Sequence, residues 1–149
     1  DLYCGMGLFS LSTMDLVDNA LGIEAHPESI RLAQESAAGT NVRYICSEAE
    51  RLEPEVLEGC NILLADPPRA GMHSRVLEII QRQSFREILY ISCNPKQGVK
   101  DLAPLLPLYR LDSIKLFDQF PQTPHVEMII HLRRESEDGS RRLIHRLVL

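Results

Sequence analysis

Short apolar runs alternate with helix-like segments along most of this chain, and that alternation constrains its fold more than any other feature. An apolar run bounded by turn residues is typical of a buried strand, and an apolar face repeating at helical spacing is typical of a helix. Strands that alternate with helices predict an α/β fold with a mostly parallel, doubly wound sheet. We expect strands at 20–24, 42–46, 61–65, 87–91, 109–117 and 126–132, and helices at 8–16, 27–38, 48–57, 75–82 and 99–106.

The two ends of the chain depart from this alternation. The last two expected strands have no helix between them, which favours an antiparallel hairpin at the edge of the sheet. At the other end, residues 1–5 are typical of a strand that runs into a turn, so we expect the body of a first strand to lie upstream. We expect one domain over residues 1–134 and a tail over 135–149, polar at first and then either amphipathic or disordered.

The composition argues against several classes of protein. Apolar residues make up 44% of the 149 residues and charged residues 25%, as in a single soluble globular domain, and no apolar stretch is long enough to span a membrane. The four cysteines lack metal-ligand spacing, so we expect no metal site and a reducing, cytoplasmic setting. Because the net charge is -5 and nucleic-acid binders are usually basic, a polyanionic partner would need a local basic patch or another domain.

A glycine turn and two acidic residues suggest a nucleotide-like ligand. Gly5 and Gly7 follow the first strand end, where glycines let the backbone approach a ligand closely, although such a turn alone is a weak signal. Glu24 ends the next strand, where an acid commonly binds ribose hydroxyls. Glu48 follows the third strand and could meet an adenine edge, but capping of a helix explains an acid there equally well.

The segment Asp66-Pro67-Pro68-Arg69 is a stronger signal. Two consecutive prolines fix an extended turn and would hold Asp66 rigidly at the rim of its strand. A simple strand-to-helix turn would account for the prolines. It would not account for an acid on one side of them and an arginine on the other.

Cys93 directly follows an apolar strand and precedes Asn94-Pro95, which ends that strand. A thiol in this position lies at the carboxyl end of a strand, where open α/β sheets hold their ligands. Taken alone, such a cysteine is more often a small buried hydrophobe than a nucleophile.

Four motifs in order connect these features: residues 1–7 (DLYCGMG), 66–69 (DPPR), 92–95 (SCNP) and 117–127 (FDQFPQTPHVE). Together they resemble the catalytic domain of the S-adenosylmethionine-dependent RNA uracil-5 methyltransferases, which modify uridines in tRNA or 23S ribosomal RNA. The resemblance covers residues 1 to about 134. Its last two motifs are specific, whereas the first is shared by many methyltransferases.

This resemblance implies a Rossmann-like class I methyltransferase fold, S-adenosylmethionine as the cofactor, and RNA with a flipped uridine as the partner. It implies that Cys93 is the nucleophile, that Glu127 accepts a proton, and that Tyr3, Glu24 and Asp66 contact the cofactor. A further family contact, a glutamine, would lie upstream. Some members also carry an upstream OB-like domain and an iron–sulfur cluster.

The chemistry follows from the residue types themselves. Uracil C5 is a poor nucleophile, but a thiolate that adds to C6 makes C5 enolate-like and able to take a methyl group. A base must then remove the C5 proton so that the thiol can leave, and Cys93 and Glu127 suit these two roles. A free thiol is mostly protonated at neutral pH, so backbone amides after Asn94, or the cations Lys96 and Arg69, would have to assist it.

Other side chains have weaker assignments. The target base would have to be flipped out of its RNA stack. Arg69, Arg75, Lys96 and Lys100 could contact phosphates or be solvated surface charges, and His125 is more simply a turn residue than an acid or base.

Three other functions fit parts of the sequence. An amino-methylating enzyme acting on N6 of adenine or N4 of cytosine would have an aromatic residue after the prolines, where this chain has Arg69, and would not need Cys93 or Glu127. A non-catalytic domain that binds S-adenosylmethionine or RNA would not need them either. A cysteine hydrolase would need a histidine paired with Cys93 and would leave the nucleotide-like features unexplained.

Overall fold

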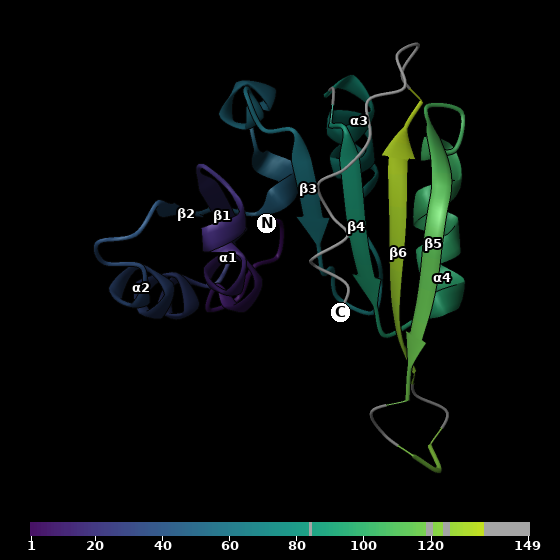
Figure 1. Cartoon of the computed structure of the whole chain (residues 1–149), viewed down its shortest axis with the longest axis horizontal. Helices are drawn as coiled ribbons and strands as arrows, with labels where there is room; N and C mark the ends of the chain where they lie inside the picture. Colours follow the sequence, from purple (N-terminus) through teal and green to yellow (C-terminus); the bar gives the residue numbers. More distant parts are fainter. Residues whose placement is uncertain (84, 119–120, 124–125, 136–149) are drawn as a thin grey trace.

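The computed structural model describes residues 1–83, 85–118, 121–123 and 126–135, and its strands lie side by side in one layer (Figure 1). One pair of strands is parallel, and a second sheet of four strands has the order β3-β4-β6-β5. In that sheet β3 pairs with β4 in parallel, whereas β6 is antiparallel to both β4 and β5. The strands are β1 (Ala20–Glu24), β2 (Val42–Cys46), β3 (Ile62–Ala65), β4 (Glu87–Ser92), β5 (Tyr109–Phe117) and β6 (Glu127–Arg134).

Leu2 joins the two sheets. It forms one parallel bridge with Ile23 of β1 and another with Ala65 of β3. Its amide donates to the Leu64 carbonyl, and its own carbonyl accepts from the Asp66 amide. The first residues therefore complete a strand order of β2-β1-(Leu2)-β3-β4-β6-β5.

Helices and short helical turns connect the strands, and α3 and α4 lie on the same face of the four-stranded sheet (Figure 1). Within the described part of the chain, no helix is both long and apolar enough to cross a bilayer. The helical segments are α1 (Leu8–Ser12), η1 (Met14–Leu16), α2 (Pro27–Ser36), η2 (Ala49–Arg51), η3 (Pro54–Leu57), α3 (Ser74–Arg82), α4 (Pro95–Leu102) and η4 (Ala103–Leu105).

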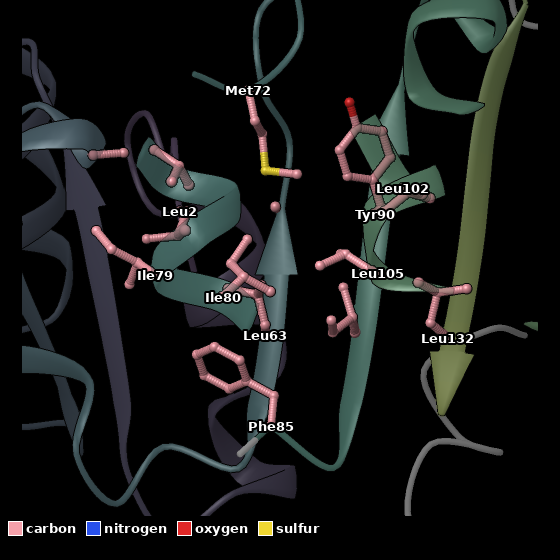
Figure 2. Close-up of a cluster of buried hydrophobic side chains, with 14 of the residues drawn as sticks. Leu2, Leu63, Met72, Ile79, Ile80, Phe85, Tyr90, Leu102, Leu105 and Leu132 are labelled. Carbon is pink, nitrogen blue, oxygen red and sulfur yellow. The ribbon is translucent and has the colours of Figure 1, made fainter. Parts of the chain in front are cut away.

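Two clusters of buried apolar side chains pack the helices against the strands. In the larger cluster, Ile79 and Ile80 of α3 lie near Leu2 and Leu63 (Figure 2). Tyr90 of β4 lies near Leu102 of α4 in the same cluster. A smaller cluster packs α2 against β1 and β2. The apolar alternation of the sequence thus marks the buried side of most elements.

The predicted α/β fold is confirmed, including the antiparallel hairpin of β5 and β6. Two expected helices are divided into shorter pieces. Residues 8–16 form α1 and η1 separately, because Thr13 leaves the helical conformation and its hydroxyl bonds back to the Phe9 carbonyl. Residues 48–57 form two short turns, since a residue that precedes a proline, here Pro54, favours extended backbone.

The helix expected at 99–106 begins earlier, at Pro95. The side chain of Asn94 caps it by accepting from the Gln97 amide, and a proline already has the φ angle of a first helical turn. Strand β6 starts one residue later than expected and runs on to Arg134. The predicted tail beyond residue 135 lies outside the described residues.

Replacing Leu2 tests its role as the link between the two sheets. Leu2 is 2% exposed, so Leu2→Ala should lower the free energy of unfolding by about 2–5 kcal/mol, the range for truncating a buried leucine. Urea denaturation followed by circular dichroism would measure this loss. Leu8→Ala is the matched control, because Leu8 is 69% exposed; equal stability of the two variants would contradict the assigned role of Leu2.

Candidate active site

The parallel pairing at Leu2 gathers three of the predicted site residues at one edge of the sheet. Leu2 pairs with the last residue of β3 and with the residue before the end of β1. Tyr3, Glu24 and Asp66 are the residues that follow these pairs, so all three stand where the parallel strands end. The crevice of an open α/β sheet forms at this edge.

The antiparallel pairing of β4 and β6 brings the two proposed catalytic residues to the same edge. Ser92 lies opposite Met128, so the next residue on each side of that pair is Cys93 or Glu127. Strand β3, which ends before Asp66, and β6, which starts at Glu127, lie on either side of β4, and burial and then the charge of Glu127 raise the pKa of Asp66. Cys93, Glu127 and Asp66 therefore come to the same edge of the sheet, and their roles in one site stay a prediction.

The glycine turn is tied to Glu24. One carboxylate oxygen, Oε2, accepts from the Gly5 amide at 3.1 Å, and Oε1 accepts from the His26 amide at 2.8 Å. Tyr3, Gly5 and Gly7 all have positive φ angles, and this left-handed backbone curls the turn around the Glu24 side chain. The turn and the acid predicted to act together are thus in direct contact.

The glycine turn rests on a side chain that no sequence motif marks. The Tyr44 hydroxyl lies 3.0 Å from the Ser10 hydroxyl and 3.4 Å from the Gly7 carbonyl, which accepts from it. A Cβ atom on Gly7 would lie 2.1 Å from the Tyr44 hydroxyl, so the ring fills the space that a side chain would need. Inward alternation in β2 marks Tyr44 as buried, but no sequence signal pairs it with Gly7.

Tyr3 is half-buried beside the loop that follows β3. Burial is the main factor that raises its pKa to about 12, with further contributions from Glu50 and Asp101, while a backbone hydrogen bond with His73 acts in the opposite direction. The phenol is therefore neutral at physiological pH. It can accept or donate a hydrogen bond but carries no charge.

Glu48 and His125 are two further residues considered in the sequence. Glu48 is exposed and forms an ion pair with Arg51, and although it precedes η2 its side chain makes no capping hydrogen bond. Its contact with an adenine edge stays a prediction. His125 lies outside the described residues.

Cys93 sits in a tight turn between β4 and α4. The Ser92 hydroxyl donates to the Asn94 carbonyl and accepts from the Asn94 amide, both at 3.0 Å. The Asn94 side chain caps α4 and also donates to the Arg69 carbonyl at 3.2 Å. This last bond links two of the four sequence motifs, the proline turn at 66–69 and the cysteine turn at 92–95.

The remaining cysteines and the four candidate cations differ in their exposure. Cys4 is buried and Cys60 packs against the core, whereas Cys46 is exposed. Among the described residues, no group of three or more His, Cys, Asp or Glu side chains could hold a metal ion. The four cations that could contact phosphates are all exposed: Arg69, Arg75, Lys96 and Lys100.

Comparison with known proteins identifies the family. The family model described as tRNA (Uracil-5-)-methyltransferase matches residues 1–135. The chain belongs to the tRNA (uracil-5-)-methyltransferase family. An uncharacterized RNA methyltransferase of Clostridium tetani is 35% identical to this family member over 139 residues, and one of Chlamydia pneumoniae is 37% identical over 143 residues. Each match covers 91% of this chain but only 30% and 35% of the respective relative, so the chain spans about a third of their length.

Solved structures agree with this assignment. The tRNA (uracil-54, C5)-methyltransferase of Pyrococcus abyssi, in complex with S-adenosyl-L-homocysteine, superposes with a TM-score of 0.80 at 30% identity. That match covers 89% of this uracil-5 methyltransferase family member and 32% of the P. abyssi chain. The magnesium protoporphyrin IX methyltransferase of Synechocystis shares the fold, with a TM-score of 0.69 at 11% identity, a match that covers 91% of this chain and 68% of that one.

A pair of glycine variants tests the support of the glycine turn. Gly7 and Gly39 have φ angles of +83° and +80°, so alanine at either position should cost about 1–2 kcal/mol of backbone strain. A Cβ atom at Gly39 would meet nothing within 4 Å, whereas at Gly7 it would overlap the buried Tyr44 ring. Gly7→Ala should therefore lower the free energy of unfolding, measured in urea, clearly more than Gly39→Ala; equal losses would contradict the packing described.

The raised pKa of Asp66 predicts a pH-dependent gain from Asp66→Asn. The pKa of Asp66 is raised from 3.8, so its ionised form destabilises the fold as pH rises from about 4 through the raised value. Asn cannot ionise, so the variant should be more stable than the parent at pH 7, and this advantage should shrink toward pH 4. Urea unfolding at several pH values would measure it, with exposed Asp15→Asn as the control; a pH-independent difference would contradict the burial of an unpaired carboxylate.

Proposed function

We propose that residues 1–134 form the catalytic domain of an enzyme that methylates C5 of a uridine in RNA through a covalent bond between Cys93 and uracil C6. The register of β4 and β6 carries this proposal, because it sets a thiol and a carboxylate side by side at the ligand edge of the sheet. The polar tail that follows is outside this domain. Transfer RNA is the substrate class we favour, since the family model and the P. abyssi enzyme both name tRNA.

The edge of the sheet suits S-adenosylmethionine as the cofactor. Glu24 is fixed by two backbone amides and keeps free lone pairs for ribose hydroxyls, and a Cβ on Gly5 would meet nothing within 4 Å, so the turn leaves open space beside it. Asp66 and Tyr3 border the same edge. When bound, the cofactor supplies an electrophilic methyl group on a sulfonium sulfur.

Cys93 begins the reaction as a nucleophile. Its thiolate forms a bond to uracil C6, and the π electrons of the C5–C6 bond move toward C5 and the O4 carbonyl, so that C5 becomes nucleophilic. The position of Cys93 between a strand end and the start of α4 suits this role, because its backbone is fixed by the Ser92–Asn94 hydrogen bonds. A uracil ring must stand clear of its neighbours in the RNA to be reached, which requires base flipping.

Glu127 ends the reaction as the base. Once C5 carries the methyl group, the Glu127 carboxylate takes the C5 proton, the C5–C6 double bond re-forms, and the bond between C6 and the Cys93 sulfur breaks to release the thiolate. Asp66 lies near enough to repel Glu127 electrostatically. Together with burial, this repulsion raises the pKa of Asp66.

RNA binding would require surfaces beyond this edge. The net charge of -5 gives the whole chain no general attraction for a polyanion. The exposed cations Arg69, Lys96 and Lys100 are carried by the proline turn and α4, on either side of Cys93 in the sequence. We infer that they contact phosphates next to the target uridine, and that the other two thirds of a full-length relative contribute the remaining RNA affinity.

Trapping the covalent intermediate tests this function. The protein as its gene encodes it would be incubated with tRNA containing 5-fluorouridine and with S-adenosylmethionine. Glu127 cannot remove fluorine as a proton, so an adduct that survives denaturant should accumulate, and mass spectrometry should map it to Cys93. Sequencing the trapped RNA would name the uridine, and 23S ribosomal RNA would be tested in parallel.

Two variants and a control sharpen the result. Cys93→Ser should form no adduct, whereas Cys60→Ser, which alters a cysteine just before the amino end of β3 and so at the opposite edge of the sheet, should react like the parent. Glu127→Gln should accumulate the adduct on ordinary uridine, because the base is lost after methyl transfer. Methylation of RNA without any adduct would overturn the covalent mechanism, and methylation at an amino group would overturn the uracil assignment.

A further inference from the structure

A buried carboxylate, Asp101 of α4, lies behind the candidate active site and takes no part in the chemistry proposed above. It is 3% exposed and accepts three hydrogen bonds. Its Oδ2 atom accepts from the Met72 amide at 2.8 Å and from the Tyr90 hydroxyl at 2.6 Å, and Oδ1 accepts from Gln97 Nε2 at 2.8 Å. The three donors come from the loop after β3, from β4 and from the first turn of α4.

The loop backbone packs directly against this carboxylate at Gly71. Gly71 has a φ angle of +86°, and a Cβ atom there would lie 2.5 Å from Oδ2 and 2.7 Å from Oδ1 of Asp101. The Gly71 amide donates to the Pro68 carbonyl at 2.8 Å, which closes a turn directly after the proline pair. Asp101 therefore holds the far end of the loop that starts at Asp66.

Helix α4 is itself fixed to the sheet. Gly98 lets the helix pack so closely that a Cβ atom would lie 2.8 Å from Met128 and 3.1 Å from the Tyr90 ring. Asn94, at the start of the helix, bonds to the Arg69 carbonyl of the same loop. The loop therefore bonds to α4 or its cap at Arg69 and at Met72, on either side of its turn. Helix α4 in turn packs against β4 and β6, the strands next to Cys93 and Glu127.

Charge makes the Asp101 clamp stronger than neutral hydrogen bonds would. A buried carboxylate is stable only when donors satisfy it, and hydrogen bonds to an ionised group are roughly twice as strong as neutral ones. Burial, and then the hydrogen bond with Asp101, raise the pKa of Tyr90, so its phenol stays protonated and remains a donor. Removing the carboxylate would leave two buried donors, Met72 and Tyr90, and the half-buried Gln97 amide without their acceptor.

We propose that Asp101 is a positioning residue that fixes the 66–72 loop against the segment that carries Cys93. In this way it sets the distance between the cofactor side of the site and the nucleophile. The inference rests on the proposed function, because the loop begins with Asp66 on the cofactor side. Cys93 stays in place through β4 even when the loop moves. Loss of the clamp should therefore impair methyl transfer more than the addition of Cys93 to uracil.

Three variants separate the contributions of charge and hydrogen bonding. Asp101→Ala removes all three bonds. Asp101→Asn keeps an acceptor for Met72 and Tyr90, and a rotated Gln97 amide can accept from the new NH2 group. Tyr90→Phe removes one donor and leaves the carboxylate in place. Exposed Asp15→Asn is the matched control for loss of an acidic charge.

Two rates, measured in the protein as its gene encodes it, distinguish positioning from general destabilisation. The first is single-turnover methyl transfer to tRNA at saturating S-adenosylmethionine. The second is exchange of the uridine C5 hydrogen with solvent without cofactor, which reports addition of Cys93 to C6. Methyl transfer should fall about 100-fold in Asp101→Ala, as expected for a displacement near 1 Å, and less in Asp101→Asn and Tyr90→Phe. The exchange rate should stay within about threefold in all of them, since Cys93 does not move.

Amide hydrogen exchange tests the clamp without relying on activity. The Met72 amide should exchange at least about tenfold faster in Asp101→Asn and Asp101→Ala, the change expected when one buried hydrogen bond is weakened, while β4 and β6 keep their protection. Unchanged exchange at Met72 would overturn the proposal, as would equal losses in both reaction rates or a loss of protection throughout the sheet. A parent protein that methylates no uridine would instead overturn the proposed function, and the exchange of Met72 would still decide whether the clamp exists.

Discussion

The parallel pairing of Leu2 with β1 and β3 is the contact on which the rest of the site depends. A parallel pairing aligns strands so that their carboxyl ends meet at one edge, and here one residue aligns two neighbours at once. Tyr3, Glu24 and Asp66 converge because each directly follows this alignment. Slipping the register by one residue would turn their side chains to the other face of the sheet.

A second pairing, of opposite direction, completes the site. Antiparallel β6 returns along β4 and brings Glu127, which is distant in sequence, next to the turn that holds Cys93. A fully parallel sheet would place the amino end of this strand at the far edge. The hairpin of β5 and β6 is therefore more than an edge cover, because it delivers the proposed base to the nucleophile.

Much of this arrangement was predictable because it follows from local patterns. Strands β1, β2 and β5 have the predicted bounds, since their apolar runs end at clear turn residues. Glu24, Asp66 and Cys93 were proposed as site residues because each lies at or just after the end of such a run. The start of α4 at Pro95 was predicted wrongly even though Asn-Pro is a capping signal, because the same dipeptide also ends a strand.

The parts that sequence reasoning missed depend on contacts between distant segments. Tyr44 lies beneath Gly7 and Asp101 behind Gly71, and both pairs form only when the chain has folded. An aspartate in an amphipathic helix ordinarily faces solvent, so the pattern of α4 gives no reason to bury Asp101. The glycines were visible in the sequence as turn residues, but the side chains that fill the space beside them were not.

Asp101 and Asp66 lie near the same loop but differ in how many hydrogen-bond donors their carboxylates meet. Asp101 meets three donors, so its charge is satisfied and the carboxylate adds rigidity. Asp66 is half-buried beside another carboxylate, so burial and repulsion both raise its pKa and leave it in need of a partner. One loop connects the two, with Asp66 at its start and Asp101 holding its end. The carboxylate with three donors thus restrains the loop that carries the carboxylate without one, and Asp66 stays at the edge of the sheet where a ligand could supply a partner.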